Sequence, residues 1–181
     1  SIFLAEYATK KIQNFLCSLI DLLAGIPSVV YGIWGVLVIV PLIRVVAPFF
    51  GRESGSGYSI LAGGIILSIM IFPVIIQISV EVLKNVPGEI KEASLTLGAT
   101  KWQTIKFVVL KKAFPGIMAA IILALSRAFG ETMAVLMVVG NVAMIPKSVF
   151  DPGYPLPALI ANNYGEILSI PLYDSALMLA S

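Results

Sequence analysis

Two charged residues, Arg127 and Glu131, stand alone in the stretch from Gly116 to Gly140, which otherwise holds apolar, small and neutral polar residues. An arginine offers a planar fork of N–H donors that fits the oxygens of phosphate. A nearby carboxylate can hold that fork while the site is empty and be displaced by the anion. Glu131 could also accept a proton from a protonated phosphate oxygen, which would disfavour fully deprotonated sulfate. The chemistry that this pair indicates is the binding and passage of an anion.

The stretch has the length of a membrane-spanning helix, and a helix would place both charges on one face. Ala120, Ala124, Arg127, Glu131 and Ala134 recur at steps of three and four, and their face is small and charged. The opposite face carries an apolar stripe suited to lipid or bulky packing, made of Ile122, Leu125, Phe129, Met133 and Leu136.

Helix geometry also sets the expected depth of the arginine. Counted from Lys112, Arg127 would lie about 22 Å along the helix, beyond the bilayer midplane. An unpaired charge there costs at least about 3 kcal/mol, which the i,i+4 spacing to Glu131 would reduce. A purely structural intramembrane salt bridge is the alternative interpretation.

A second group of functional residues lies in the polar segment from Glu81 to Lys112, which holds six lysines. Such an excess over the neighbouring loops indicates the cytoplasmic side of a membrane. We expect two short helices here, because Pro87 suits a first turn, Gly98 suits a helix stop, and Thr100 with Gln103 has capping-box spacing. The loop is therefore predicted to be structured.

The amino-acid composition indicates whether the chain lies in water or in lipid. The 181 residues are 59% hydrophobic and 12% charged, with a mean hydropathy of +0.99, values typical of a protein in lipid. A net charge of +2 is too small to suggest nucleic acid. One cysteine, Cys17, and no histidine argue against a disulfide, a Cys/His metal site and histidine catalysis.

Three spans and a truncated fourth are expected. The first apolar stretch, Phe15 to Phe50, is interrupted at Pro27 and Pro41 and is interpreted as a short helix followed by a span. The second span covers roughly 58–82, the third 116–140, and an outer loop at about 141–170 leads into the truncated last span. Alternation across the membrane then places Lys10 and Lys11 inside, with 51–57 and 141–170 outside.

The cytoplasmic loop resembles a known family. Its segment Glu92-Ala93-Ser94-Leu95-Thr96-Leu97-Gly98-Ala99-Thr100 resembles the EAA motif of permeases of ATP-binding-cassette (ABC) importers. The family often continues with Leu-Pro where this chain has Leu110-Lys111, while Pro115-Gly116-Ile117 matches the later part. The resemblance implies that this loop docks on a separate ATPase subunit through Glu89, Glu92, Ala93, Ser94, Gly98, Ala99 and Thr100. An amphipathic helix lying at the lipid interface without a partner is the alternative.

A narrower resemblance covers nearly the whole chain. The run from Ser126 to Val135, followed by Gly140-Asn141, and the run from Ala24 to Gly32 resemble phosphate permease subunits of the PstC type. That resemblance implies a substrate pathway through Arg127 and Glu131, with no catalytic residue and no metal ligand. The PstA-type partner shares the Arg-Ala-x-Gly-Glu-Thr core, and Gly140-Asn141 with the long outer loop favour PstC.

The expected fold is all-α, a polytopic transmembrane helical bundle of the type I ABC importer permease (MetI-like) class. Residues 1–181 are expected to form one permease domain, truncated at both ends, with its coupling-helix loop at about 84–112, in the cytoplasmic (inner) membrane. The sequence has no Gly-x-x-x-x-Gly-Lys-Ser/Thr motif, so ATP and Mg are expected on a partner and no cofactor on this chain.

The expected partners are a second, PstA-like permease, a PstB-like ATPase dimer, a PstS-like extracytoplasmic phosphate-binding protein and membrane lipid, but no nucleic acid. Three alternatives stay open. They are an importer for sulfate, molybdate or phosphonate, an anion channel or ion-driven transporter that needs no ATP, and a structural membrane scaffold.

Overall fold

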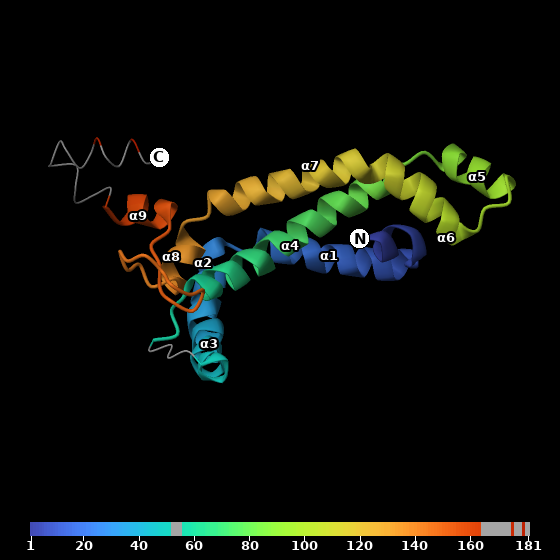
Figure 1. The fold of residues 1–181 in the computed structure, drawn as a ribbon. Helices are drawn as coiled ribbons and strands as arrows, with labels where there is room; N and C mark the ends of the chain where they lie inside the picture. The colour runs from blue at the N-terminus through green and yellow to red at the C-terminus, as the bar shows by residue number, and fades with distance from the viewer. Residues whose placement is uncertain (52–55, 164–174, 176–178, 180–181) are drawn as a thin grey trace. The chain divides into compact units, whose positions relative to one another are not determined.

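The computed structural model describes residues 1–51, 56–163, 175 and 179, and helices dominate it (Figure 1). In chain order the elements are η1 (Phe3–Tyr7), α1 (Lys10–Gly25), α2 (Ser28–Trp34), η2 (Gly35–Ile39), α3 (Val40–Val46), η3 (Ala47–Phe50), α4 (Ile60–Lys84), α5 (Gly88–Thr96), α6 (Lys101–Gln103), η4 (Thr104–Val109), α7 (Leu110–Phe129), α8 (Met133–Val138) and α9 (Leu156–Asn163). The prediction of an all-α chain is confirmed.

Three continuous helical stretches in the described residues are long and apolar enough to cross a bilayer. They are Ser28–Phe50, Ile60–Lys84 and Lys101–Phe129, with 23, 25 and 29 residues. About 20 residues are needed to cross the hydrocarbon core. The first two agree with the spans expected from the sequence, and the second differs from its predicted range by only two residues at each end.

Two prolines shape the first stretch as predicted. Helix α1 ends at Gly25, and Pro27 stands immediately before α2, because proline suits a helix start and disfavours helix for the residue before it. Pro41 lies in the first turn of α3, directly after the π-helical turn η2. This wider turn precedes the proline, and the stretch remains helical through it.

The third span differs from its prediction. The helical stretch begins after Thr100 and ends at Phe129, whereas the sequence predicted 116–140. Hydropathy placed the lysines of the loop outside the helix, but a helix can extend beyond the lipid while lysine side chains reach water. At the other end, Gly130 has low helix propensity, and a turn bond from Glu131 N to Ala128 O (3.2 Å) closes the helix.

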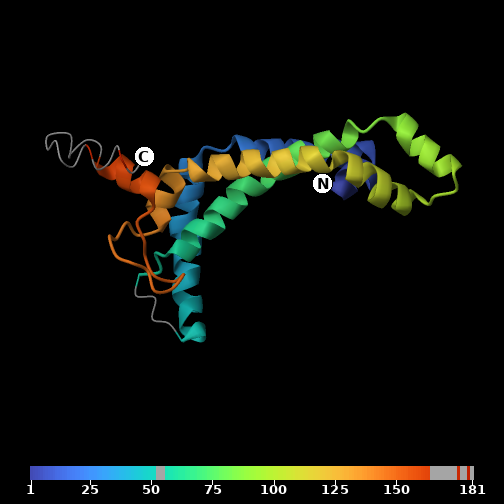
Figure 2. The ribbon, with the colours of Figure 1, turned by 45° about the horizontal axis from the view of Figure 1, so that its top comes forward.

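The chain forms two compact units. The first comprises Ser1–Gly25 and Ile71–Arg127. Its apolar core holds Leu83, Val86, Val109 and Ala113, with Ile2, Ala5, Val82 and Ile117 packed against them. In Figures 1 and 2 the part of α4 in this unit runs beside α7, with α5 and α6 at the end of this hairpin. The contact is close, because a Cβ on Gly116 would lie 2.5 Å from Val82 Cγ1.

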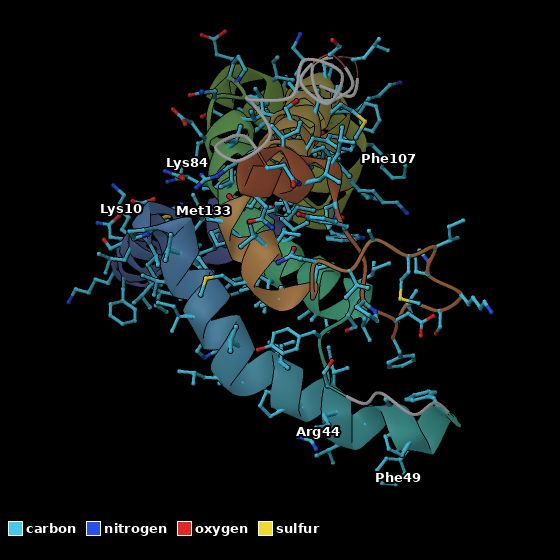
Figure 3. All side chains as sticks on the ribbon, turned by 90° about the vertical axis from the view of Figure 1, so that its left-hand side faces the viewer. Lys10, Arg44, Phe49, Lys84, Phe107 and Met133 are labelled. Atoms are coloured by element: carbon cyan, nitrogen blue, oxygen red, sulfur yellow. The ribbon has the colours of Figure 1, made fainter. Side chains whose placement is uncertain are left out.

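The second unit comprises Ile26–Met70 and Ala128–Ser181. Its core is built by α2, η2, α3, α4 and α8 and holds Tyr31, Ile39, Val40, Ile43, Ala62, Ile66, Met70, Ala134, Val135, Val138 and Val139. The start of α4 is anchored here: Ser59 Oγ accepts from Ala62 N (3.1 Å), and Ile60 N donates to Asp151 O (3.1 Å). Figure 3 shows the side chains of Arg44 and Phe49 projecting outward from the α3–η3 stretch.

The segment predicted as the outer loop contains a helix. Residues 141–155 are irregular, but α9 begins at Leu156, inside the range 141–170 that the sequence assigned to loop. Asp151 organises the irregular part, since its Oδ2 accepts from the N–H groups of Lys147 and Ser148, both at 2.9 Å. The rest of the predicted loop and nearly all of the predicted last span lie outside the described residues.

Candidate functional site

Helix α5 is an independent short helix between two spans, as predicted, and local signals define both of its ends. Pro87 precedes its first residue. At its other end Gly98 has φ +85, Gly98 N donates to Leu95 O (3.0 Å), and Ala99 N donates to Ser94 O (3.3 Å). These two bonds make a Schellman stop, which requires the left-handed conformation that glycine adopts without strain.

The following helix begins with the predicted capping box. Thr100 Oγ1 accepts from Gln103 N (3.3 Å), and Gln103 Oε1 accepts from Thr100 N (2.8 Å). Two helix N–H groups are thereby satisfied reciprocally. The connection from α5 to α6 is thus a defined turn rather than a flexible tether.

The residues implied in docking are largely accessible. Glu89, Glu92, Ala93, Gly98 and Thr100 are exposed, while Ser94 and Ala99 are partly buried. The hydroxyls of Ser94 and Thr104 are hydrogen-bonded at 3.0 Å, so Ser94 holds α5 against η4. The structure therefore separates the predicted set into an exposed group and two residues partly enclosed in the loop.

Sequence analysis missed two contacts of this loop with the start of the chain. Lys91 Nζ of α5 lies 2.6 Å from Glu6 Oε1, the only ion pair found among the described residues. Lys101 Nζ of α6 lies 4.9 Å from the centre of the Tyr7 ring. These contacts bring η1 against the coupling loop. No short-range sequence pattern predicts the ion pair, because Glu6 and Lys91 are 85 positions apart.

Arg127 lies in the last turn of α7 and is exposed. A cation is favourable there, because the free carbonyl groups at a helix C-terminus carry partial negative charge. Earlier in α7, Ala120 and Ala124 of the predicted small-residue face are buried, as is Ala113. On the opposite side of α7, Ile122, Leu125 and Phe129 of the predicted apolar stripe are exposed. The other two residues of the stripe, Met133 and Leu136, and Ala134 of the small face lie on α8, so the prediction of one continuous helix for these faces is wrong.

Glu131 does not lie on the helix that carries Arg127, so the predicted i,i+4 arrangement is wrong. The helix ends two residues earlier, at Phe129. Instead, Glu131 Oε1 accepts a hydrogen bond from Ala134 N (3.1 Å) in the first turn of α8. The carboxylate is partly buried, and the bond satisfies one N–H that a short helix leaves free.

The second unit contains a cavity beside Glu131. Its volume is about 280 Å³, and its wall includes Gly63, Gly64 and Phe129 along with the carboxylate. Among the described residues the remaining wall is apolar, and Glu131 is the only ionisable residue that lines it. The geometry is that of a single acceptor facing a small space formed by α4, α8 and the start of α9.

A further polar cavity lies in the first unit, between α1 and α4, with a volume of about 410 Å³. Asp21, Gln77, Glu81, Lys84 and Asn85 supply its polar groups. The spacing of the α4 residues, at steps of four and three, was a readable signal that sequence analysis did not use. Across the described residues, no three His, Cys, Asp or Glu side chains gather as a metal site.

Comparison with known proteins places the chain in a family. Residues 1–166 match the family described as "Binding-protein-dependent transport system inner membrane component". The chain is 44% identical over 184 residues to a Bacillus subtilis protein named probable ABC transporter permease protein YqgH, covering 99% of this chain and 58% of that protein.

Two further relatives are named phosphate transport system permease protein PstC, the first with the qualifier "probable". One is from Methanocaldococcus jannaschii, 37% identical with 99% of this chain and 62% of the relative covered. The other is from Xylella fastidiosa, 37% identical with 99% and 59% covered. This chain thus spans about three fifths of the length of these curated relatives. It belongs to the family of inner-membrane components of binding-protein-dependent transport systems.

Proposed function

We propose that this chain is the core part of a permease subunit in an ATP-driven ABC importer that moves inorganic phosphate across the cytoplasmic membrane. The observation that carries this proposal is α5, an exposed helix with defined ends between two membrane spans. An element of this kind can receive a movement from a protein in the cytoplasm and pass it to both spans. A passive channel or a structural scaffold does not require such a helix.

The proposal assigns ATP and Mg to a partner. A dimer of ATP-binding subunits would engage the exposed residues of the loop, above all Glu89 and Glu92. A second, similar permease would complete the pathway, and an extracytoplasmic binding protein would deliver the anion. Support comes from the family description, which names a binding-protein-dependent transport system.

Phosphate as the cargo rests on two kinds of support. Several relatives carry the name of phosphate permease, at 37% identity, and Arg127 supplies an exposed guanidinium beyond the long apolar face of α7. Guanidinium groups bind phosphate oxygens through paired N–H donors. We assign Arg127 to contact with the anion and Glu131 to the same pathway as a hydrogen-bond or proton acceptor.

The test is uptake of labelled phosphate by vesicles that hold the full-length permease, its partner subunits, the binding protein and internal ATP. Arg127→Gln should abolish most ATP-dependent uptake without changing assembly. Arg44→Gln is the matched control, since Arg44 is likewise an exposed arginine in the last turn of a helix. Normal uptake by the Arg127 variant would show that this residue does not serve the cargo. Competition by sulfate, molybdate or phosphonate tests the choice of anion directly.

A further inference from the structure

The segment before α1 packs on the base of the coupling loop. Leu4 of η1 is buried, and Ile2 and Ala5 lie against the core formed by Leu83, Val86, Val109 and Ala113. Gln13 Nε2 of α1 donates to Leu4 O (2.7 Å). This bond ties η1 to the helix that follows it, so the segment is held from two directions.

Two consecutive side chains of η1 then reach α5 and α6. Helix α6 is the first turn of the third helical stretch rather than the second short helix that the sequence predicted. Glu6 pairs with Lys91 of α5 at 2.6 Å, with 11% and 24% of the two side chains exposed. Tyr7 presents its ring to Lys101 of α6, 4.9 Å from the ammonium group. An ion pair so little exposed to water is screened less than a surface pair, and the cation–π contact adds to it.

Helix α5 needs such contacts to keep its position. It has nine residues, and isolated helices of this length are marginal in water. In the described structure, the side-chain hydrogen bonds that join α5 to other elements are Lys91 to Glu6 and Ser94 to Thr104. The first ties α5 to η1, and the second ties it to η4, on the opposite side of the turn.

We infer that Glu6 and Tyr7 form a clamp, in which they are positioning residues that fix the coupling helix α5 through Lys91 and the start of the following helix through Lys101. This inference rests on the proposed function, since the clamp matters only where α5 receives movement from an ATPase. It gives that movement an additional route. Displacement of α5 passes through Lys91 and Glu6 to η1, and from η1 through the Gln13 bond to α1.

The test uses the full-length complex and reads position and transport separately. Glu6→Gln keeps the size of the side chain and removes its charge. Hydrogen–deuterium exchange of the amides of residues 88–96 should become about tenfold faster, the change that about 1.4 kcal/mol gives, while exchange in α4 stays the same. Phosphate taken up per ATP hydrolysed should fall. The double charge exchange, Glu6→Lys with Lys91→Glu, should restore both readouts.

Asp21→Asn is the matched control, because it neutralises an exposed carboxylate of the same unit that makes no ion pair in the described structure. Unchanged exchange in the Glu6 variant would overturn the clamp. Faster exchange with normal coupling would overturn its role in transport. If the wild-type complex takes up no phosphate, the cargo proposal fails, and the exchange experiment together with ATPase activity stimulated by the binding protein still decides on the clamp.

Discussion

Glu131 offers a direct separation of a structural role from a transport role. Its Oε1 accepts from Ala134 N, and a glutamine at this position would present an amide oxygen in the same place. Glu131→Gln therefore keeps the cap and removes the charge, whereas Glu131→Ala removes both. A helix cap contributes about 1 kcal/mol, so the alanine variant should lose about that much stability and the glutamine variant less than about 0.5 kcal/mol.

The two variants should differ in stability but lose transport to a similar extent. A hydrogen bond to a charged group contributes about 1.5–3 kcal/mol, which corresponds to roughly a tenfold to hundredfold loss of rate. If the carboxylate serves the anion in the cavity of about 280 Å³, both variants should lose uptake to that extent. The assay is the initial rate of ATP-dependent phosphate uptake, measured with the thermal melting of the purified complex.

Two results would refute this reasoning. Wild-type uptake by the glutamine variant would mean that the carboxylate only caps α8. Equal destabilisation of both variants would mean that a glutamine amide oxygen does not replace the carboxylate oxygen as the acceptor for Ala134 N. Because stability and uptake are read separately, a loss of uptake through unfolding cannot be mistaken for a loss of chemistry.

Three further predictions concern packing and the coupling loop. Gly63→Ala should lower the melting temperature of the complex, because the new Cβ would lie 2.6 Å from Val139 Cγ2, and overpacking of this kind costs about 1–3 kcal/mol. Gly64→Ala is the control and should be neutral, since no atom lies within 4 Å of a Cβ there. Equal effects of the two substitutions would contradict this packing. Gly98→Ala should cost about 1–2 kcal/mol through its positive φ and weaken co-purification of the ATPase subunit, whereas retention at the wild-type level would argue against a fixed turn. Thr100→Ala should speed amide exchange at residues 101–103 through loss of the cap; an unchanged rate would show that the capping box contributes little.

Sequence reasoning succeeded where a structure is encoded within a few residues. The ends of α5 and the start of α6 follow from Pro87, Gly98 and the pair of Thr100 with Gln103, all within one loop. Caps and glycine stops act through neighbouring backbone groups, so their signals survive without knowledge of the fold. The second span was equally readable, because α4 is almost entirely apolar over residues 60–76 and becomes polar only toward its end.

The same reasoning failed where a boundary or contact depends on more than hydropathy. Apolar residues continue past Gly130, so the prediction from hydropathy extended the third span to residue 140, although α7 ends at Phe129. Glu131 was consequently placed on the wrong helix, although Gly130 followed by a polar pair was a usable sign of a break. The clamp of Glu6 on Lys91 had no usable sign, since a pair 85 positions apart is set by the packing of η1.

The charges left free on α5 bear on whether it meets lipid or protein. Of its three charged residues, Lys91 is paired with Glu6, and Glu89 and Glu92 remain exposed. The cytoplasmic surface of a membrane is negative and attracts basic segments, so a helix that presents two carboxylates is repelled by it. A protein groove with basic side chains is complementary to the same surface. The ion pair with Glu6 thus holds the helix and also leaves its free face acidic, which favours an ATPase partner over the lipid interface.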